Sequence, residues 1–143
     1  MATRPADDEA WRTFRAALRA AQNRFAQGDS GGMRDLYSHG EDASIFGGFG
    51  GLERGWDEVG PRLDWAAGQF SGGKHDEDLL FEHVGDDFSY TVAIEHNHGG
   101  RHPQTGRDSS VDLRVTMIYR KEDGAWRIVH RQADPVLQTR PPG

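Results

Sequence analysis

The feature that most constrains the fold is a pair of strand-like segments near the C-terminal end, residues 111–119 and 125–135. Both are rich in β-branched and aromatic residues, which favour strands. They flank Asp123 and Gly124, a dipeptide typical of short β-hairpin loops because Gly accepts a positive φ. The sequence therefore predicts that these segments form an antiparallel β-hairpin.

The predicted register of this hairpin starts with Lys121 opposite Ala125, which sets Thr116 opposite His130. Side chains of a strand alternate between two faces. One face then carries Arg114, Thr116, Ile118, Trp126, Ile128, His130 and Gln132. A face that mixes apolar with polar and charged side chains is typical of a pocket wall with an apolar floor.

Length and composition limit the class of protein. The 143 residues predict a single domain, 1–143, with a structured core at about 9–135 and a flexible tail at 136–143. The net charge of −6 argues against a binder of nucleic acid backbones. Mean hydropathy is −0.79 and no segment resembles a membrane span or a secretory signal. Together with the absence of cysteine, this predicts a cytoplasmic protein without disulfides.

The order of sequence patterns predicts an α+β domain. Apolar residues at spacings of three and four predict a first helix through residues 11–25, a short second helix near 33–37 and a third through 56–70. From residue 79 onward the patterns are those of strands. Helices followed by strands favour helices packed on one face of a curved antiparallel sheet.

Four local patterns in this order resemble the NTF2-like superfamily, and in particular its SnoaL-like and ketosteroid-isomerase-like domains. They are residues 25–29, 36–47, 55–59 and 119–130. The resemblance implies a cone-shaped half-barrel with three N-terminal helices on the sheet, a deep pocket, and a homodimer formed through the outer sheet face. The superfamily includes isomerases, polyketide cyclases, dehydratases and domains without catalysis, so the fold does not name the reaction.

The two well-described enzyme subtypes of this superfamily use catalytic residues that this chain lacks at the aligned positions. Ketosteroid isomerases use acidic and Tyr side chains at positions that align with Gly47, Ala21 and Thr116 here. Polyketide cyclases use a His and an Asp at positions that align with Thr116 and Ala133, with Asp134 one residue out of phase. The sequence therefore resembles the superfamily but lacks the catalytic residues of both subtypes.

Three other residues are candidates for catalysis. His130 lies on the predicted pocket face and suits acid–base chemistry, and the alternative is a structural histidine that bonds Thr116 across the strand pair. Arg114 could clamp an anion or a carbonyl, and Glu95 could act as a base. The alternative is an Arg114–Glu95 ion pair that only fixes the sheet, and spacing alone does not separate these readings. The predicted ligand-binding residues are Thr116, Gln132, Trp126, Ile118, Tyr90, Trp56, Trp65 and Phe46.

A second cluster, His96, His98 and His102, offers imidazoles at a spacing that could bind zinc. The neighbouring glycines and Pro103 indicate a loop instead, so the sequence predicts no metal and no cofactor. The leading functional hypothesis is a cofactor-independent isomerase, cyclase or dehydratase acting on an apolar carbonyl- or carboxylate-bearing molecule. A non-catalytic ligand-binding or association module of the same fold is the alternative, and a metal protein using the histidine cluster is a weaker one.

Overall fold

The computed structural model describes residues 8–137 and 142. In this part of the chain the elements follow the order α1 (Glu9–Phe25), α2 (Gly31–Leu36), β1 (Ser44–Phe46), β2 (Glu53–Arg54), α3 (Trp56–Ala67), β3 (Lys74–Val84), β4 (Phe88–His98), β5 (Val111–Glu122) and β6 (Ala125–Pro135). Most of the predicted tail at 136–143 lies outside the described residues. No helix in the described part is long and apolar enough to cross a lipid bilayer.

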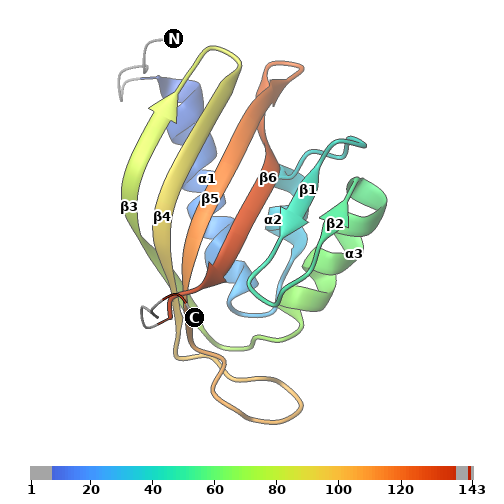
Figure 1. The fold of residues 1–143 in the computed structure, drawn as a ribbon, viewed down its shortest axis with the longest axis vertical. Coiled ribbons are helices and arrows are strands. Elements are labelled where there is room, and N and C mark those ends of the chain that lie inside the picture. The colour runs from blue at the N-terminus through green and yellow to red at the C-terminus, as the bar shows by residue number, and fades with distance from the viewer. Residues whose placement is uncertain (1–7, 138–141, 143) are drawn as a thin grey trace.

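The strands form one curved sheet that does not close, in the order β2-β1-β6-β5-β4-β3 (Figure 1). Strands β3 to β6 pair antiparallel with their neighbours in sequence. Strand β1 lies parallel to β6, so the sheet is mixed and the prediction of an antiparallel sheet is wrong at this edge. Hairpin loops fix the direction of β3 to β6, but β1 is distant from β6 in sequence and no tight turn constrains its direction.

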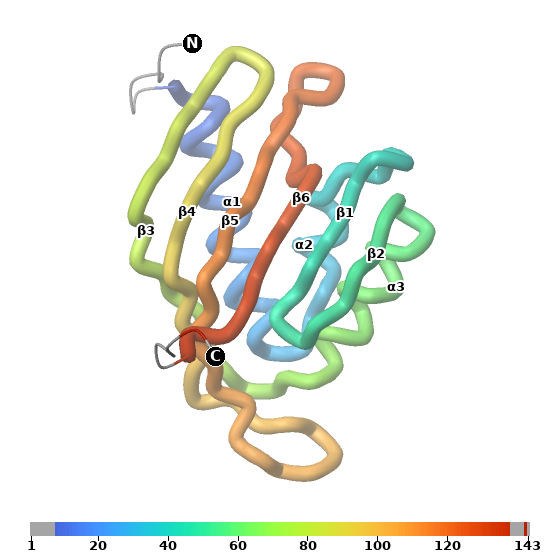
Figure 2. The backbone as a smooth tube through the Cα atoms, viewed as in Figure 1, coloured from blue at the N-terminus to red at the C-terminus, as the bar shows by residue number. Residues whose placement is uncertain are grey.

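The helices lie on one side of the sheet. In Figure 1, α1 and α2 lie behind the strands and α3 lies beside β1 and β2. Figure 2 follows the chain from α2 through β1 and β2 into α3, so the third helix comes after the first two strands. The fold is therefore α+β, as predicted, with the first two strands inserted between its helices.

Helix α1 is amphipathic, as its sequence predicted. The Asp8 side chain caps its start by accepting a hydrogen bond from the Trp11 backbone N–H at 3.1 Å. Its buried stripe includes Phe14 and Leu18 and packs on the sheet. Gln22 lies on the same stripe and is also buried, which brings a polar group to the interior.

The turn of the β5–β6 hairpin is tighter than predicted. Asp123 and Gly124 have φ values of 51° and 80°, the left-handed conformation at both positions of a two-residue loop. Glu122 consequently pairs with Ala125, where Lys121 was expected. This moves the register by one residue at the turn, which exchanges the faces of one strand relative to the other.

A β-bulge then changes the register again. Tyr119 pairs with Ile128, but the next pair is Ile118 with His130, which leaves Val129 without a partner on β5. An extra residue in one strand reverses the alternation of its side chains beyond that point. The side chains of β6 after the bulge therefore face opposite to those predicted from simple alternation.

The predicted pocket face is consequently divided between two faces. Trp126 and Ile128 point toward the helices and are buried in the core. Beyond the bulge, the outer face of the sheet carries Arg114, Thr116, Ile118, His130 and Gln132. The inner face carries Leu113, Val115, Met117 and Tyr119 of β5, together with Arg131 and Ala133 of β6.

The core is densest where α1 crosses β5 and β6. The rings of Trp11, Phe14, Tyr119 and Trp126 pack against one another with centroids 5.1 to 5.7 Å apart, mostly edge to face. This aromatic cluster fills the wide end of the space between sheet and helices. The other end of the same space is less filled and contains polar side chains.

Candidate functional site

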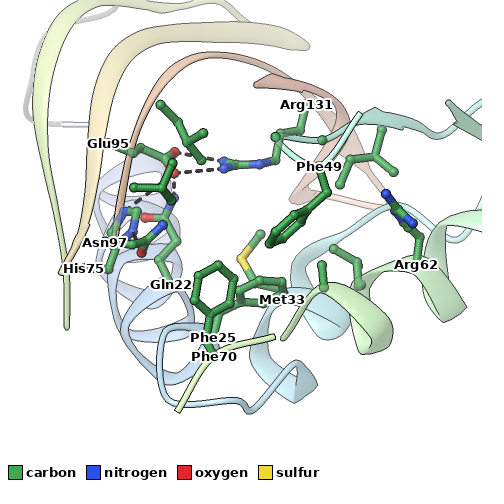
Figure 3. Close-up of a pocket in the computed structure, with 17 residues that line it drawn as sticks. Gln22, Phe25, Met33, Phe49, Arg62, Phe70, His75, Glu95, Asn97 and Arg131 are labelled. Carbon is green, nitrogen blue, oxygen red and sulfur yellow. Dashed lines mark hydrogen bonds and ion pairs between the residues drawn. The ribbon is translucent and has the colours of Figure 1, made fainter. Parts of the chain in front are cut away.

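A cavity lies between the inner face of the sheet and the helices (Figure 3). Its volume is about 100 Å³. One side is apolar and the deep end is polar, as is common in small-molecule sites. The lining residues are Gln22, Phe25, Met33, Ile45, Gly47, Gly48, Phe49, Arg62, Leu63, Ala66, Phe70, His75, Glu95, Asn97, Val111, Leu113 and Arg131.

An ion pair between Glu95 of β4 and Arg131 of β6 occupies the deep end (Figure 3). Arg131 Nη1 and Nη2 donate to the two carboxylate oxygens at 2.8 and 2.9 Å, and the Glu95 side chain is 1 % exposed. Burial by itself would raise the pKa of Glu95, but the charge and hydrogen bonds of Arg131 lower it below the ordinary value. Glu95 is therefore a carboxylate whose negative charge is held by its partner, which makes it a weak base.

His75 of β3 lies beside this pair. Its Nδ1 is 2.9 Å from the side-chain oxygen of Asn97, and its backbone N–H donates to Asn23. Because an amide oxygen only accepts hydrogen bonds, Nδ1 carries the proton and the neutral ring has its lone pair on Nε2. Nε2 is buried, has no hydrogen-bond partner, and lies 3.8 Å from a carboxylate oxygen of Glu95.

Gln22 of α1 provides a second unpartnered atom at the deep end. Its Nε2 donates to Glu95 at 3.2 Å, while its Oε1 is buried and accepts no hydrogen bond. The carboxylate fixes this orientation, because the opposite amide rotamer would place two oxygens together. The deep end therefore presents two acceptors, Gln22 Oε1 and His75 Nε2, that lack donors.

The mouth of the cavity is aromatic. Phe49 lies in the glycine-rich loop after β1, is 51 % exposed and packs against Phe70 and Trp65. Gly50 follows it with φ 90°, a conformation that other residues rarely adopt. Arg62 stacks over Trp65 with its guanidinium carbon 4.2 Å from the ring centre. A ligand entering here passes an apolar rim before it reaches the polar end.

A second buried polar group lies next to the cavity. Arg15 of α1 forms an ion pair and hydrogen bond with Glu77 and donates to the Tyr119 hydroxyl at 3.3 Å. Tyr119 also bonds Thr91 at 2.7 Å, and burial raises its pKa to about 12. This network is satisfied internally and connects α1 to three strands of the sheet.

One trio of described side chains has the spacing of a metal site. His75, Glu77 and Glu95 offer ligand atoms within 4.8 Å of one another. Each carboxylate is already paired with a guanidinium, Glu77 with Arg15 and Glu95 with Arg131. Two positive charges against the ligand atoms oppose the binding of a cation, so this donor set does not fit a metal.

The predicted catalytic residues are not brought together. Arg114 lies on the outer face, where its Nε donates to Asp134 at 2.7 Å, so neither predicted arrangement with Glu95 is formed. His130 is also outward, with Nδ1 2.7 Å from the Ser44 hydroxyl, and burial lowers its pKa. Only Glu95 of the three lines the cavity. The bulge in β6 is the physical reason for the misplacement of His130.

The predicted ligand-binding residues lie elsewhere in the molecule. Four are on the outer face of the sheet, namely Thr116, Gln132, Ile118 and Tyr90. Phe46 packs against His130 on the same side, and Trp126 is in the core. Trp56 stacks on His39 at the start of α3, and Trp65 borders the mouth through Phe49.

The histidine cluster does not converge on one point. His96 of β4 lies between Asp78 and Asp112, at 3.1 and 2.7 Å. His98 bonds Asp76 on β3, and His102 bonds Gln69 beyond α3. The outer position of His96 and His98 follows from the strict alternation of β4, which turns Glu95 and Asn97 inward. Within residues 8–137 these imidazoles serve separate contacts.

Sequence reasoning missed Gln22, His75 and Arg131, which with Glu95 and Asn97 form the polar end of the cavity. A signal existed for the first two. Gln22 falls one turn after Leu18 on the buried stripe of α1, and His75 alternates with Glu77 on one face of β3. Arg131 gave no such signal, because simple alternation turns it away from Ile128.

Comparison with known proteins identifies the family of this chain. The model of the SnoaL-like domain matches residues 14–137. The chain belongs to the SnoaL-like domain family. This family is part of the NTF2-like superfamily, as the sequence patterns predicted. No curated protein matches the chain.

Solved structures agree with this SnoaL-like fold. An NTF2-like superfamily protein from Salmonella enterica superposes with a TM-score of 0.74 and 18 % identity, over 91 % of this chain and 92 % of the other. A candidate calcium/calmodulin-dependent protein kinase type II association domain from Thiobacillus denitrificans gives 0.66 and 18 %, over 96 % and 100 %. A candidate dehydratase from Streptomyces avermitilis gives 0.67 and 18 %, over 92 % and 97 %. At these identities the likeness concerns the fold alone.

Proposed function

We propose that this SnoaL-like protein is a cofactor-independent enzyme that begins an isomerisation, cyclisation or dehydration by transferring a proton from its substrate to His75. The sheet and helices would form the half-barrel of the superfamily, with the cavity as its interior. The observation that carries the proposal is the buried, unpartnered Nε2 of His75, a residue that lines the cavity. A histidine in such a position suits general base catalysis near neutral pH.

The neighbours of His75 support this role. Asn97 orients the ring through Nδ1 and leaves the lone pair on Nε2. When Nε2 takes up a proton, the carboxylate of Glu95 at 3.8 Å stabilises the imidazolium. A base, a group that orients it and a nearby charge that stabilises its protonated form are the usual components of acid–base sites.

The same contacts restrict the substrate. Both terminal nitrogens of Arg131 are committed to Glu95, so this guanidinium is not available to bind an anion. Phe25, Phe49 and Phe70 line the route from the mouth to the polar end. A neutral, mostly apolar compound therefore suits the cavity better than a carboxylate.

The test is exchange of the methyl protons of acetophenone into D₂O, followed by ¹H NMR. We expect the wild-type protein to accelerate exchange over buffer and His75→Gln to lose this acceleration by about 100-fold or more. His130→Gln is the matched control, because it changes the same residue type on the outer face and should retain exchange. Circular dichroism checks the fold of both variants. Equal exchange by wild type and His75→Gln, or no exchange above buffer, would contradict the proposal.

The second candidate is a binding and association module, and the outer face of the sheet favours it. Large apolar side chains are exposed there, including Phe81 at 66 %, Phe88 at 55 % and Tyr90 at 43 %. Exposed apolar patches on a soluble protein commonly mark interfaces, and two similar structures are candidate association domains. We propose a homodimer through this face. Light scattering should give twice the monomer mass, and Phe81→Lys should lower it toward the monomer; a wild-type monomer would refute the proposal.

A further inference from the structure

We infer that the ligand of the cavity is a neutral hydroxylated compound whose hydroxyl donates to Gln22 Oε1, one of the two unpartnered acceptors at the deep end. This inference rests on the proposed function to the extent that both use the same cavity. It goes beyond that function because it assigns the chemical group that reaches the deep end. The argument depends on which hydrogen-bonding capacities of the described residues are already used.

The acceptor character of the deep end follows from fixed orientations. Glu95 accepts from Gln22 Nε2, which leaves Gln22 Oε1 directed away from the carboxylate. Asn97 accepts from His75 Nδ1, which leaves Nε2 as an acceptor. Both free atoms are buried and unpartnered. Leaving a buried acceptor without a donor is costly, so a ligand that supplies one gains affinity.

The charges nearby exclude an anionic ligand. The carboxylate of Glu95 accepts from Gln22 Nε2 and lies 3.8 Å from His75 Nε2. Arg131, the cation at this end, donates to both oxygens of Glu95 and also contacts Met117 Sδ at 3.8 Å. A carboxylate or phosphate would meet acceptors and a negative charge without a free cation to balance it.

An ammonium group is also disfavoured. It could donate to the free acceptors, but the charge of Glu95 is already neutralised by Arg131. The ammonium would then be buried among Phe25, Phe70 and other apolar side chains without a counter-ion. A hydroxyl donates without carrying a charge and pays no such penalty.

The dimensions suit a hydroxyl on a short arm. A cavity of about 150 Å³ holds benzene, and this one has a volume of about 100 Å³. The enclosed part therefore accommodates less than one six-membered ring, and the remainder of the ligand extends toward Phe49 at the mouth. Benzyl alcohol has this form, with one methylene between its ring and its hydroxyl.

Four probes of similar size test the inference in the wild-type protein. Benzyl alcohol donates and accepts, benzaldehyde only accepts, benzoate is anionic and benzylamine is cationic. Titrations followed by ¹H–¹⁵N NMR at neutral pH should show benzyl alcohol binding about tenfold more tightly than benzaldehyde, with benzoate and benzylamine weaker still. The largest shift changes should fall on residues of the deep end. Equal affinity for the alcohol and the aldehyde, no binding of the alcohol at saturating concentration, or tighter binding of either ion would overturn the inference.

Two variants test whether Gln22 is the source of the preference for the alcohol over the aldehyde. Gln22→Leu should reduce the alcohol-to-aldehyde affinity ratio toward one, whereas Gln132→Leu, the same change on the outer face, should leave it unchanged. If Gln22→Leu does not fold, the wild-type series with shift mapping at the deep end remains a complete test. An alcohol preference without acetophenone exchange would refute the proposed catalysis and retain the inference. Exchange that depends on His75, without a preference for the alcohol, would refute the inference and retain the proposed catalysis.

Discussion

Removal of the guanidinium that neutralises Glu95 should strongly destabilise the protein. Arg131→Met keeps much of the side-chain volume but leaves a carboxylate that is 1 % exposed without its partner. Breaking a buried pair from one side costs about 3–5 kcal/mol. Because domains are stable by only about 5–15 kcal/mol, this is a large fraction of the total. The urea midpoint should fall by roughly 2 M, given the usual dependence of unfolding free energy on urea.

The loss of unfolding free energy in Arg131→Met should depend on pH, and the pKa of Glu95 sets the direction of that dependence. In the wild type, the lowered pKa of Glu95 means that its stabilisation is present above its ordinary pKa of 4.5 and is lost as pH falls through the folded pKa. In Arg131→Met, burial raises the Glu95 pKa instead, so the penalty is relieved as the carboxyl is protonated. The gap in unfolding free energy between the two proteins should therefore narrow from pH 7.5 to pH 5.

Tryptophan fluorescence during urea unfolding measures both effects. The matched control is Arg114→Met, since the Arg114–Asp134 pair has a similar contact distance but side chains that are 65 % and 45 % exposed. Its loss should leave the midpoint essentially unchanged. The double variant Arg131→Met with Glu95→Gln should recover most of the stability, because no charge is then buried alone. A loss below about 1 kcal/mol for Arg131→Met, or a gap independent of pH, would refute the reasoning.

Three further experiments, two substitutions and one titration, test other parts of the structure. Tyr119→Phe should cost about 1–3 kcal/mol of unfolding free energy, because it leaves the buried Thr91 hydroxyl without its partner; urea denaturation measures this. His96, which lies between two carboxylates, should titrate by NMR with a pKa of about 9, so its contribution to stability is complete below pH 6.5 and is lost as pH rises through 9; a pKa near 6.5 would show that these contacts do not persist in solution. Gly28→Ala should lower the melting temperature, because Gly28 has φ 98° and an added Cβ would lie 2.8 Å from the Phe70 carbonyl; an unchanged melting temperature would contradict this.

Local patterns allowed much of the fold to be predicted. The stripe of α1 and the loop at Asp123 and Gly124 depend on neighbours a few residues apart, and the structure confirms both of them. Their physics is short-range, since a helix period or a turn conformation is set by the residues that form it. The match to the SnoaL-like family agrees with the order of these patterns.

The candidate site required information that is not local. Glu95 and Arg131 are 36 residues apart and meet only when the registers of β4 on β5 and β5 on β6 are both known. The sequence offered Glu95 as a candidate partner of Arg114, but the structure places Arg114 on the outer face of the sheet, where it pairs with Asp134.

Val129 is the residue that decides which way Arg131 and His130 face. Trp126, Ile128 and His130 alternate as if they shared one face, and nothing in their order marks an extra residue. The bulge arises from the fit of β6 between β5 and β1, which is a property of the assembled sheet. By itself the sequence determined that residues 111–135 would form a hairpin that carries polar side chains. Tertiary packing decided which of them face the cavity, because one unpaired residue reverses every side chain beyond it.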